Sequence, residues 1–176
     1  MIYVFDLDGT ITDASHRLHY IASAGKKRNW KKFFEEIPLD PAFKPMVGLV
    51  KSLSRDLDST VIMQTGRPEK YRHETITWLA RHNLNNCYDT LLMRQDGSYI
   101  RNVDQKLQFL DFIIEKYMPD DMFANICWFE DSEPVVQALN RVGVITLSCQ
   151  HFIGSHDTRV DPAHPEIPYQ DDAQSD

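Results

Sequence analysis

Long apolar runs are missing from this 176-residue sequence. None approaches the roughly 18 residues of a membrane-spanning helix, and the mean hydropathy is -0.43. The amino terminus carries Asp6 and Asp8 where a signal peptide needs an unbroken apolar stretch. These absences argue against a membrane protein, and we expect a soluble, cytoplasmic one.

Cysteine is scarce and positive charge is in the minority. The three cysteines, Cys87, Cys127 and Cys149, lie far apart, which predicts reduced thiols and no disulfide framework or Cys-x-x-Cys pair. The net charge is -7, but residues 155–176 hold six acids and a single basic residue, Arg159. The rest of the chain is therefore nearly balanced, which leaves a polyanionic substrate open.

Short β-branched or apolar runs alternate with helical patterns along most of the chain. This alternation predicts an α/β fold, with a mostly parallel sheet flanked by helices. The expected strands are Ile2–Phe5, Thr60–Gln64, Asn125–Phe129 and Val144–Leu147, and the expected helices are Pro68–His82, Lys106–Tyr117 and Pro134–Val142. Leu91–Arg101 is an exception, because Asp96-Gly97 between two short runs is typical of a hairpin.

Two segments do not follow the alternation. Residues 14–45 contain aromatic and basic helical pieces, His16–Ala24 and Asn29–Glu36, and we interpret them as a small helical insertion after the first strand. Residues 155–176 are acidic, contain three prolines and lack apolar periodicity, so we expect a flexible tail. The predicted domain is residues 1–154.

Polar clusters follow three of the expected strands. They are Asp6-Leu-Asp8, Thr65-Gly66-Arg67 and Glu130-Asp131. The carboxyl ends of parallel strands meet at one edge of the sheet, so we expect these side chains to converge there. Singly, each is also explained as a helix cap or a turn. Together they would crowd several carboxylates into one site, where a divalent cation or a shared proton must compensate the repulsion. Carboxylate oxygens suit Mg²⁺, which is the implied cofactor.

An Asp beside Mg²⁺ can attack a phosphoryl group and form an aspartyl-phosphate that water hydrolyses. A second Asp two residues later can exchange protons with the leaving oxygen and the attacking water. Four segments of the chain, in this order, resemble the four motifs of the haloacid dehalogenase (HAD) phosphatase superfamily, which has a Rossmann-like fold. They are Asp6-Leu-Asp-Gly-Thr10, Thr65-Gly-Arg67, Lys106 and Glu130-Asp131.

The resemblance implies a role for each matching residue. Asp6 is the expected nucleophile, Asp8 the general acid and base, and Lys106 the neutralising cation. Thr65 and the Gly66 amide would hold phosphoryl oxygens. The implied metal site combines Asp6, Asp8, Glu130 and Asp131.

A narrower resemblance covers residues 2–152. Six segments are similar to the phosphatase domain of phage and bacterial polynucleotide kinase-phosphatases and their stand-alone relatives. They are Phe5–Ile11, Ser15–Leu18, Trp30–Phe34, Thr65–Pro68, Leu92–Arg94 and the Lys106 helix. The chain has no G-x-x-x-x-G-K-[ST] loop, so a kinase half is not expected. Two departures stand out: the acid before Lys106, Asp104, is at a shorter spacing, and Glu130 replaces a usual Asp.

Several residues have both a substrate-binding and an ordinary structural interpretation. Arg67 is expected to grip phosphate, with a salt bridge to Glu69 or Glu130 as the alternative. His16 and Arg17 are candidates for substrate contact at the start of the insertion. The basic residues of the insertion, with Trp30 among them, either attract a polyanion or form a solvated helix face, whereas Phe33 and Phe34 are expected to pack. These basic residues are Lys26, Lys27, Arg28, Lys31 and Lys32.

The resulting hypothesis is a Mg²⁺-dependent phosphomonoester hydrolase acting on nucleotide or polynucleotide ends, with a 3′-phosphate favoured. A nucleoside monophosphate phosphatase is the alternative enzyme, and a non-catalytic phosphate-binding module is the alternative of another class. The expected partner is the phosphorylated end of a nucleotide or oligonucleotide. The sequence points to no membrane and no obligate protein partner.

Overall fold

The computed structural model describes residues 1–22, 28–117 and 125–149. Five parallel strands form one sheet in the order β3-β2-β1-β4-β5. Their bounds are β1 Ile2–Asp6, β2 Thr60–Pro68, β3 Thr90–Arg94, β4 Ile126–Glu130 and β5 Ile145–Ser148. The order reverses beside β1, which has β2 on one side and β4 on the other. The carboxyl ends of these three strands therefore meet at the position where open α/β sheets bind ligands.

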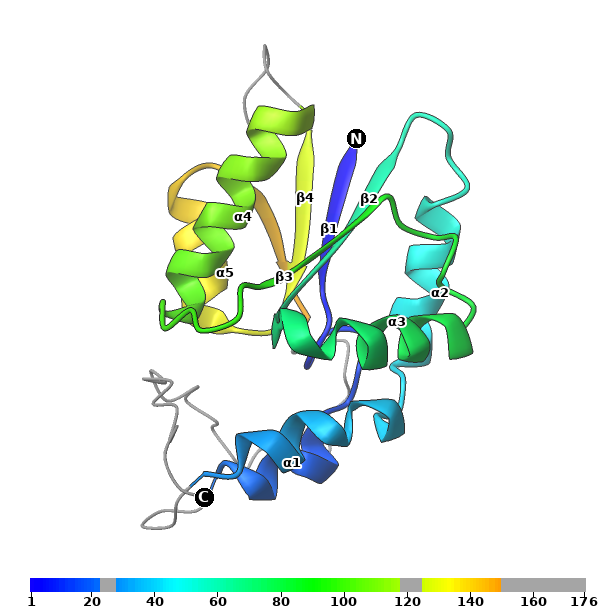
Figure 1. Cartoon of the computed structure of the whole chain (residues 1–176). Coiled ribbons are helices and arrows are strands. Elements are labelled where there is room, and N and C mark those ends of the chain that lie inside the picture. The colour runs from blue at the N-terminus through cyan, green and yellow to red at the C-terminus, as the bar shows by residue number, and fades with distance from the viewer. Residues whose placement is uncertain (23–27, 118–124, 150–176) are drawn as a thin grey trace.

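Helices cover both faces of the sheet (Figure 1). Alternate residues of a strand point to opposite faces. Val4, Ile62 and Trp128 therefore pack under α4 (Asn102–Tyr117) and α5 (Glu133–Arg141). Phe5, Met63 and Phe129 belong to the second core, with residues of α2 (Lys44–Leu53) and α3 (Arg72–Arg81). The predicted α/β fold, a parallel sheet flanked by helices, is confirmed.

The segment between β1 and α2 lies beyond the carboxyl ends of the strands (Figure 1). It contains the 3-10 helix η1 (Ser15–Tyr20), the short helix α1 (Trp30–Glu35) and the 3-10 helix η2 (Ile37–Leu39). The Asn29 side chain caps α1 by accepting a hydrogen bond from the Lys32 amide at 3.1 Å. Phe33 and Phe34 are buried, as predicted, and fix this segment against the domain.

The predicted hairpin over residues 91–101 is wrong. β3 pairs in parallel with β2 through Ile62 with Thr90 and Met63 with Leu91. The Asp96-Gly97 pair does form a turn, with Gly97 at φ 70°. The four residues after Gly97 lead directly into α4 and leave no length for a returning strand.

Other boundaries also differ from those expected. Pro68 ends β2, and a 3-10 turn, η3 (Glu69–Tyr71), precedes α3. Helix α4 begins four residues before Lys106, and α2 was not among the expected helices. Lys26, Lys27 and the tail 155–176 lie outside the described residues. No helix within the described ranges has the length and apolar character needed to cross a membrane.

Candidate active site

Three neighbouring strands bring polar side chains together: two at their carboxyl ends and one from the middle of β2. Asp6 closes β1, Glu130 closes β4, and Gln64 of β2 is the Cα partner of Asp6. Because side chains alternate along a strand, Asp6 and Gln64 are on the face of Val4 and Ile62, which α4 covers. Lys106 reaches the same place from α4, so four elements contribute to one buried cluster.

Lys106 is the cation at the centre of this cluster. Its Nζ lies 2.5 Å from Asp6 Oδ1 and 3.2 Å from Glu130 Oε2. Burial raises the pKa of Asp6 to about 8, with Lys106 opposing the rise and Glu130 adding to it. Burial, followed by the charge of Glu130, also raises the pKa of Asp131 well above its usual range. The charge of Lys106 alone therefore does not neutralise the carboxylates gathered here. Binding of a further cation at this site would be electrostatically favourable.

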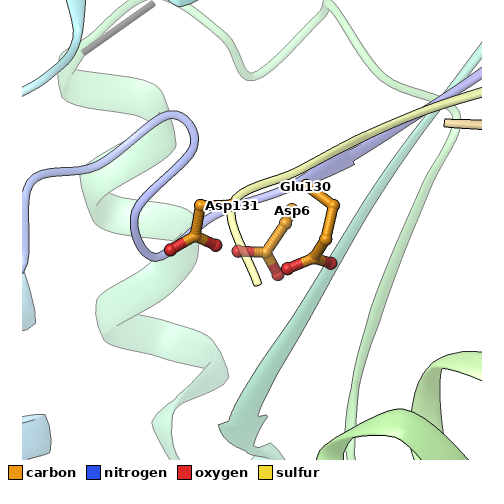
Figure 2. Close-up of side chains that lie close together, drawn as sticks. All are labelled: Asp6, Glu130 and Asp131. Carbon is orange, nitrogen blue, oxygen red and sulfur yellow. The ribbon is translucent and has the colours of Figure 1, made fainter. Parts of the chain in front are cut away.

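The donor set fits a hard divalent cation. Asp6, Glu130 and Asp131 each offer a carboxylate oxygen, and these oxygens all lie within 4.8 Å of one another. Figure 2 shows the three carboxyl groups side by side, with Asp6 between the other two. Carboxylate oxygens are the ligands that Mg²⁺ prefers. These three residues would hold the ion.

A glycine makes space for this set of acids. Gly9 has φ 85°, a conformation that L side chains rarely adopt, and a Cβ on it would lie 2.0 Å from Asp131 Oδ2. The turn after β1 therefore needs glycine for two separate reasons. The expected Asp-x-Asp-Gly motif thus has a geometric basis in the approach of Asp131.

Asp8 faces different partners, the guanidinium groups of two buried arginines. Its Oδ1 lies 2.6 Å from Arg67 Nη2 and 2.5 Å from Arg17 Nη2. Thr12 donates to the same oxygen at 3.2 Å, and Thr65 donates to Oδ2 at 3.5 Å. Burial acts to raise the pKa of Asp8, but Arg67 and then Arg17 hold it well below its usual range. The Asp8 carboxylate is not among the three acids that cluster at the metal position in the described residues.

Asp40 holds both arginines from the other side. Its Oδ1 accepts from Arg17 Nε at 2.7 Å, and its Oδ2 accepts from Arg17 Nη2 at 2.8 Å and from Arg67 Nη2 at 3.0 Å. The side chains of Asp40, Arg17 and Arg67 are all fully buried. Arg17 also lies over the Phe33 ring at 4.2 Å. The salt bridges of Arg67 run to Asp8 and Asp40, and not to Glu69 or Glu130 as the alternative interpretation held.

The remaining predicted site residues lie around these two clusters. The Thr65 hydroxyl is buried and accepts a hydrogen bond from the Arg67 amide at 3.2 Å, with Gly66 between them. His16 is more exposed, and its Nε2 lies 3.8 Å from Asp40 Oδ1. The structure therefore places His16 at the rim of the arginine cluster, and the others within the site.

Asp104 and Arg101 form an exposed ion pair with each other. Arg101 Nε donates to Asp104 Oδ2 at 2.8 Å, and Arg101 Nη2 donates to Asp104 Oδ1 at 3.0 Å, on the exposed first turn of α4. The Arg101 side chain is 65% exposed and that of Asp104 is 41% exposed. The short spacing between Asp104 and Lys106 places them on different sides of the helix, because neighbours on a helix face are three or four residues apart.

The basic residues of α1 are on its outer side. Lys31 and Lys32 are exposed, and Lys31 Nζ lies 3.8 Å from Glu35. The Trp30 ring is half-buried and meets Phe33 edge-on, with ring centroids 5.7 Å apart. Trp30 therefore packs with its own helix, whereas the lysines face solvent.

Sequence reasoning did not select Asp40 or Gln64 as site residues. Asp40 lies in the loop Ile37-Pro-Leu-Asp-Pro41. An acid among apolar residues and directly before a proline was the signal that could have pointed to it. Gln64 is a polar residue inside a run otherwise typical of a buried strand, Val61-Ile-Met63. A polar side chain in a two-sided buried strand needs a partner, and this was its signal.

The chain is similar in fold to several solved structures. It aligns with a Pnkp1 assembly, the "Pnkp1/Rnl/Hen1 complex", at 22% identity and TM-score 0.62, over 84% of this chain and 45% of that chain. A haloacid dehalogenase-like hydrolase, SP0104 from Streptococcus pneumoniae, aligns at 14% identity and TM-score 0.59, over 84% and 83% of the two chains. At these identities the likeness shows the fold.

A third structure contains the expected ligands. D,D-heptose 1,7-bisphosphate phosphatase from B. bronchiseptica, complexed with magnesium and phosphate, aligns at 18% identity and TM-score 0.51, over 82% of this chain and 78% of that chain. No curated protein sequence matches. This chain spans less than half the length of the Pnkp1-complex chain that it matches.

The family assignment comes from the sequence as a whole. The pattern of the polynucleotide kinase PNKP phosphatase domain matches residues 1–152, which include every residue of both clusters. The expected HAD fold is present in the sheet and in the structural relatives. The chain therefore belongs to the PNKP phosphatase domain family, within the HAD superfamily.

Proposed function

We propose that this protein is a phosphatase that removes phosphate from the ends of nucleotides or polynucleotides, with a 3′-phosphate preferred, and that it requires Mg²⁺. The observation that carries the proposal is the 2.5 Å contact of Asp6 with Lys106 beside the oxygens of Glu130 and Asp131. It combines a nucleophile, a neutralising cation and ligands for a metal within one buried site.

The reaction proceeds in two balanced steps. A carboxylate oxygen of Asp6 attacks phosphorus, the bond from phosphorus to the leaving oxygen breaks, and Asp8 protonates that oxygen. Water then attacks the phosphorus of the aspartyl-phosphate, Asp8 takes the proton of the water, and Asp6 is released with inorganic phosphate. Thr65 and the Gly66 amide hold phosphoryl oxygens. When bound, Mg²⁺ supplies positive charge to the phosphoryl group.

The arginine cluster suggests how Asp8 acquires its proton. Arg17 and Arg67 hold Asp8 ionised in the substrate-free protein. The negative charge of a bound phosphomonoester competes for the same guanidinium groups. Their hold on Asp8 then weakens, so its pKa rises and it can donate a proton to the leaving oxygen.

Residues 14–45 act in this proposal as a partial cap. Arg17 from η1 and Asp40 from the loop after η2 both belong to this segment, and both reach the cluster around Asp8. The cap therefore supplies part of the site and is more than a cover. The contacts of Phe33 and Arg17 bring α1 into the same unit.

The substrate class is supported by the family and by one relative. The matching family is the phosphatase domain of polynucleotide kinase PNKP. A Pnkp1 structure that this chain resembles is described as part of an RNA repair complex. We infer a polynucleotide or nucleotide end as substrate from this likeness.

The test is kcat/KM with Mg²⁺ across a panel of phosphate esters: 3′- and 5′-phosphorylated oligonucleotides, 3′- and 5′-mononucleotides, and a sugar phosphate. We expect the 3′-phosphorylated substrates to be preferred, and the Asp6→Asn protein serves as the control for contaminating phosphatase. A preference of more than about tenfold for 5′-mononucleotides, roughly 1.4 kcal/mol in transition-state binding, would instead support a nucleotidase. Phosphate binding without turnover of any ester would support a binding module.

A further inference from the structure

Gln64 joins the two carboxylates that flank Lys106. It is fully buried in β2, and its Nε2 donates to Asp6 Oδ1 at 3.1 Å and to Glu130 Oε2 at 3.4 Å. Both acceptors are carboxylate oxygens, so only the NH₂ group of the amide can face them. The two hydrogens of one amide therefore connect β2 with the ends of β1 and β4.

Gln64 and Lys106 hold the same two atoms. Lys106 Nζ lies 2.5 Å from Asp6 Oδ1 and 3.2 Å from Glu130 Oε2, which are the oxygens that Gln64 contacts. The other Glu130 oxygen, Oε1, accepts from the Ser132 amide at 3.2 Å. Both donors to Asp6 thus act on Oδ1, and Oδ2 is the oxygen that we assign to the reaction.

The orientation of the Gln64 amide comes at a cost. Its Oε1 is buried and has no hydrogen-bond partner within the described part of the chain. An unpaired buried carbonyl oxygen is unfavourable, so the contacts of Nε2 with the two carboxylates must outweigh it. A residue that served packing alone would be replaced at lower cost by an apolar one, as at the neighbouring Ile62 and Met63.

We propose that Gln64 is a positioning residue, which fixes the Asp6 and Glu130 carboxylates at the separation that binds the divalent cation and which turns Oδ2 of Asp6 toward the phosphoryl group. The inference rests on the proposed function for the second part only. The first part concerns only the spacing of Asp6 and Glu130. One carboxylate oxygen of each lies within 4.8 Å of the other and of an oxygen of Asp131.

The test replaces Gln64 with an apolar residue of similar size. Gln64→Leu removes both donors, and Ile62→Val is the matched control, because it perturbs the same strand and face without touching a carboxylate. Mg²⁺ affinity is measured by calorimetric titration and by the Mg²⁺-dependent rise in Tm. We expect the Mg²⁺ Kd of Gln64→Leu to rise by about tenfold or more, and its kcat to fall with little change in KM. Ile62→Val should keep the wild-type values.

Other outcomes overturn the proposal. Mg²⁺ affinity and kcat of Gln64→Leu within about twofold of the control would show that Gln64 only packs. Absence of Mg²⁺ binding by the wild type would overturn it as well. If Gln64→Leu fails to fold, Gln64→Asn makes the same test, since it withdraws the amide by one methylene and should weaken Mg²⁺ binding similarly. An inactive wild type that still shows the expected difference in Mg²⁺ affinity would overturn the proposed function and not the positioning of the acids.

A double-mutant comparison separates coupling from two independent effects. Glu130→Asp shortens the acid and withdraws it from the Gln64 amide and from Lys106. If Gln64 acts through Glu130, Gln64→Leu should weaken Mg²⁺ binding much less in the Glu130→Asp background than in the wild type. Equal factors in both backgrounds would show that the two residues act separately, which contradicts the proposal.

Discussion

Two aspartates separated by a single residue lie in opposite electrostatic surroundings. Burial, with the charge of Glu130 adding to it and Lys106 opposing it, raises the pKa of Asp6 to about 8, whereas two guanidinium groups keep Asp8 ionised. We expect Asp6→Asn to abolish turnover, because the amide is not a nucleophile. Asp8→Asn should lose about 10²- to 10⁴-fold in kcat on an alkyl phosphate. Its loss on p-nitrophenyl phosphate should be smaller, since p-nitrophenolate leaves without a proton.

The measurement is kcat for both variants on both substrates, with circular dichroism as the check on folding. An Asp6→Asn protein that stays active would contradict the aspartyl-phosphate route. Equal losses for Asp8→Asn on the two substrates would remove Asp8 from the role of proton donor.

Asp40 is the residue on which the two buried arginines depend. Removing its charge leaves two buried guanidinium groups with one carboxylate, that of Asp8, in place of two. We expect Asp40→Asn to lower the free energy of unfolding by about 3 kcal/mol, measured by urea denaturation. Asp104→Asn is the control, because its partner Arg101 is an exposed side chain and its loss should change stability little. Similar effects of the two substitutions would show that burial of the Asp40 pair adds no stability.

At the residue scale, the sequence predicted what a local motif can carry. Asp6, Asp8, Thr65 and Glu130-Asp131 each follow a recognisable strand, so their approach at one edge of the sheet was foreseeable. Asp40 acts on Arg17 and Arg67, which are 23 and 27 residues away in sequence, and Gln64 acts across 66 residues on Glu130. Such contacts depend on how the segments pack, and no short pattern records them.

At the scale of elements, strand and helix positions were predictable where the apolar pattern was long. The hairpin at residues 91–101 was wrong because an Asp-Gly turn fits between a strand and a helix as well as between two strands. Helix α2 went unrecognised because Lys44, Pro45 and Gly48 interrupt its apolar pattern. Pro45 lies in its first turn, where proline is tolerated, and Met46 and Val50 are buried.

Helix α1 gives the element-scale prediction. Its outer side presents Lys31 and Lys32 to solvent, next to Arg28, while Phe33 and Phe34 attach it to the domain. Replacing the three basic residues with Gln should raise KM for a phosphorylated oligonucleotide and flatten its salt dependence, because fewer counterions are released on binding. Kinetics on p-nitrophenyl phosphate should stay near wild type. Equal effects on both substrates would indicate that these residues serve the structure of the cap.

At the scale of the whole molecule, the sheet gathers more negative charge at one point than the protein offsets by itself. In the metal-free protein, the pKa values of Asp6 and Asp131 are both raised, that of Asp6 to about 8. The folded chain then binds protons that the unfolded chain has lost. Stability from these groups is therefore present below about pH 4 and falls as the pH rises toward about 8.

Mg²⁺ should reverse this trend, because it binds the ionised carboxylates and so stabilises the folded state most where they carry full charge. We expect urea unfolding in EDTA to show lower stability at pH 8 than at pH 5, and added Mg²⁺ to raise stability mainly at pH 8. Asp6→Asn removes one of the two raised groups and should reduce the slope in EDTA. Asp8 has the opposite shift, so its contribution disappears only in acid, below about pH 4, outside this window. Stability in EDTA that rises from pH 5 to pH 8 would show that Lys106 alone neutralises the acidic cluster, and that the folded protein has no electrostatic need for a metal.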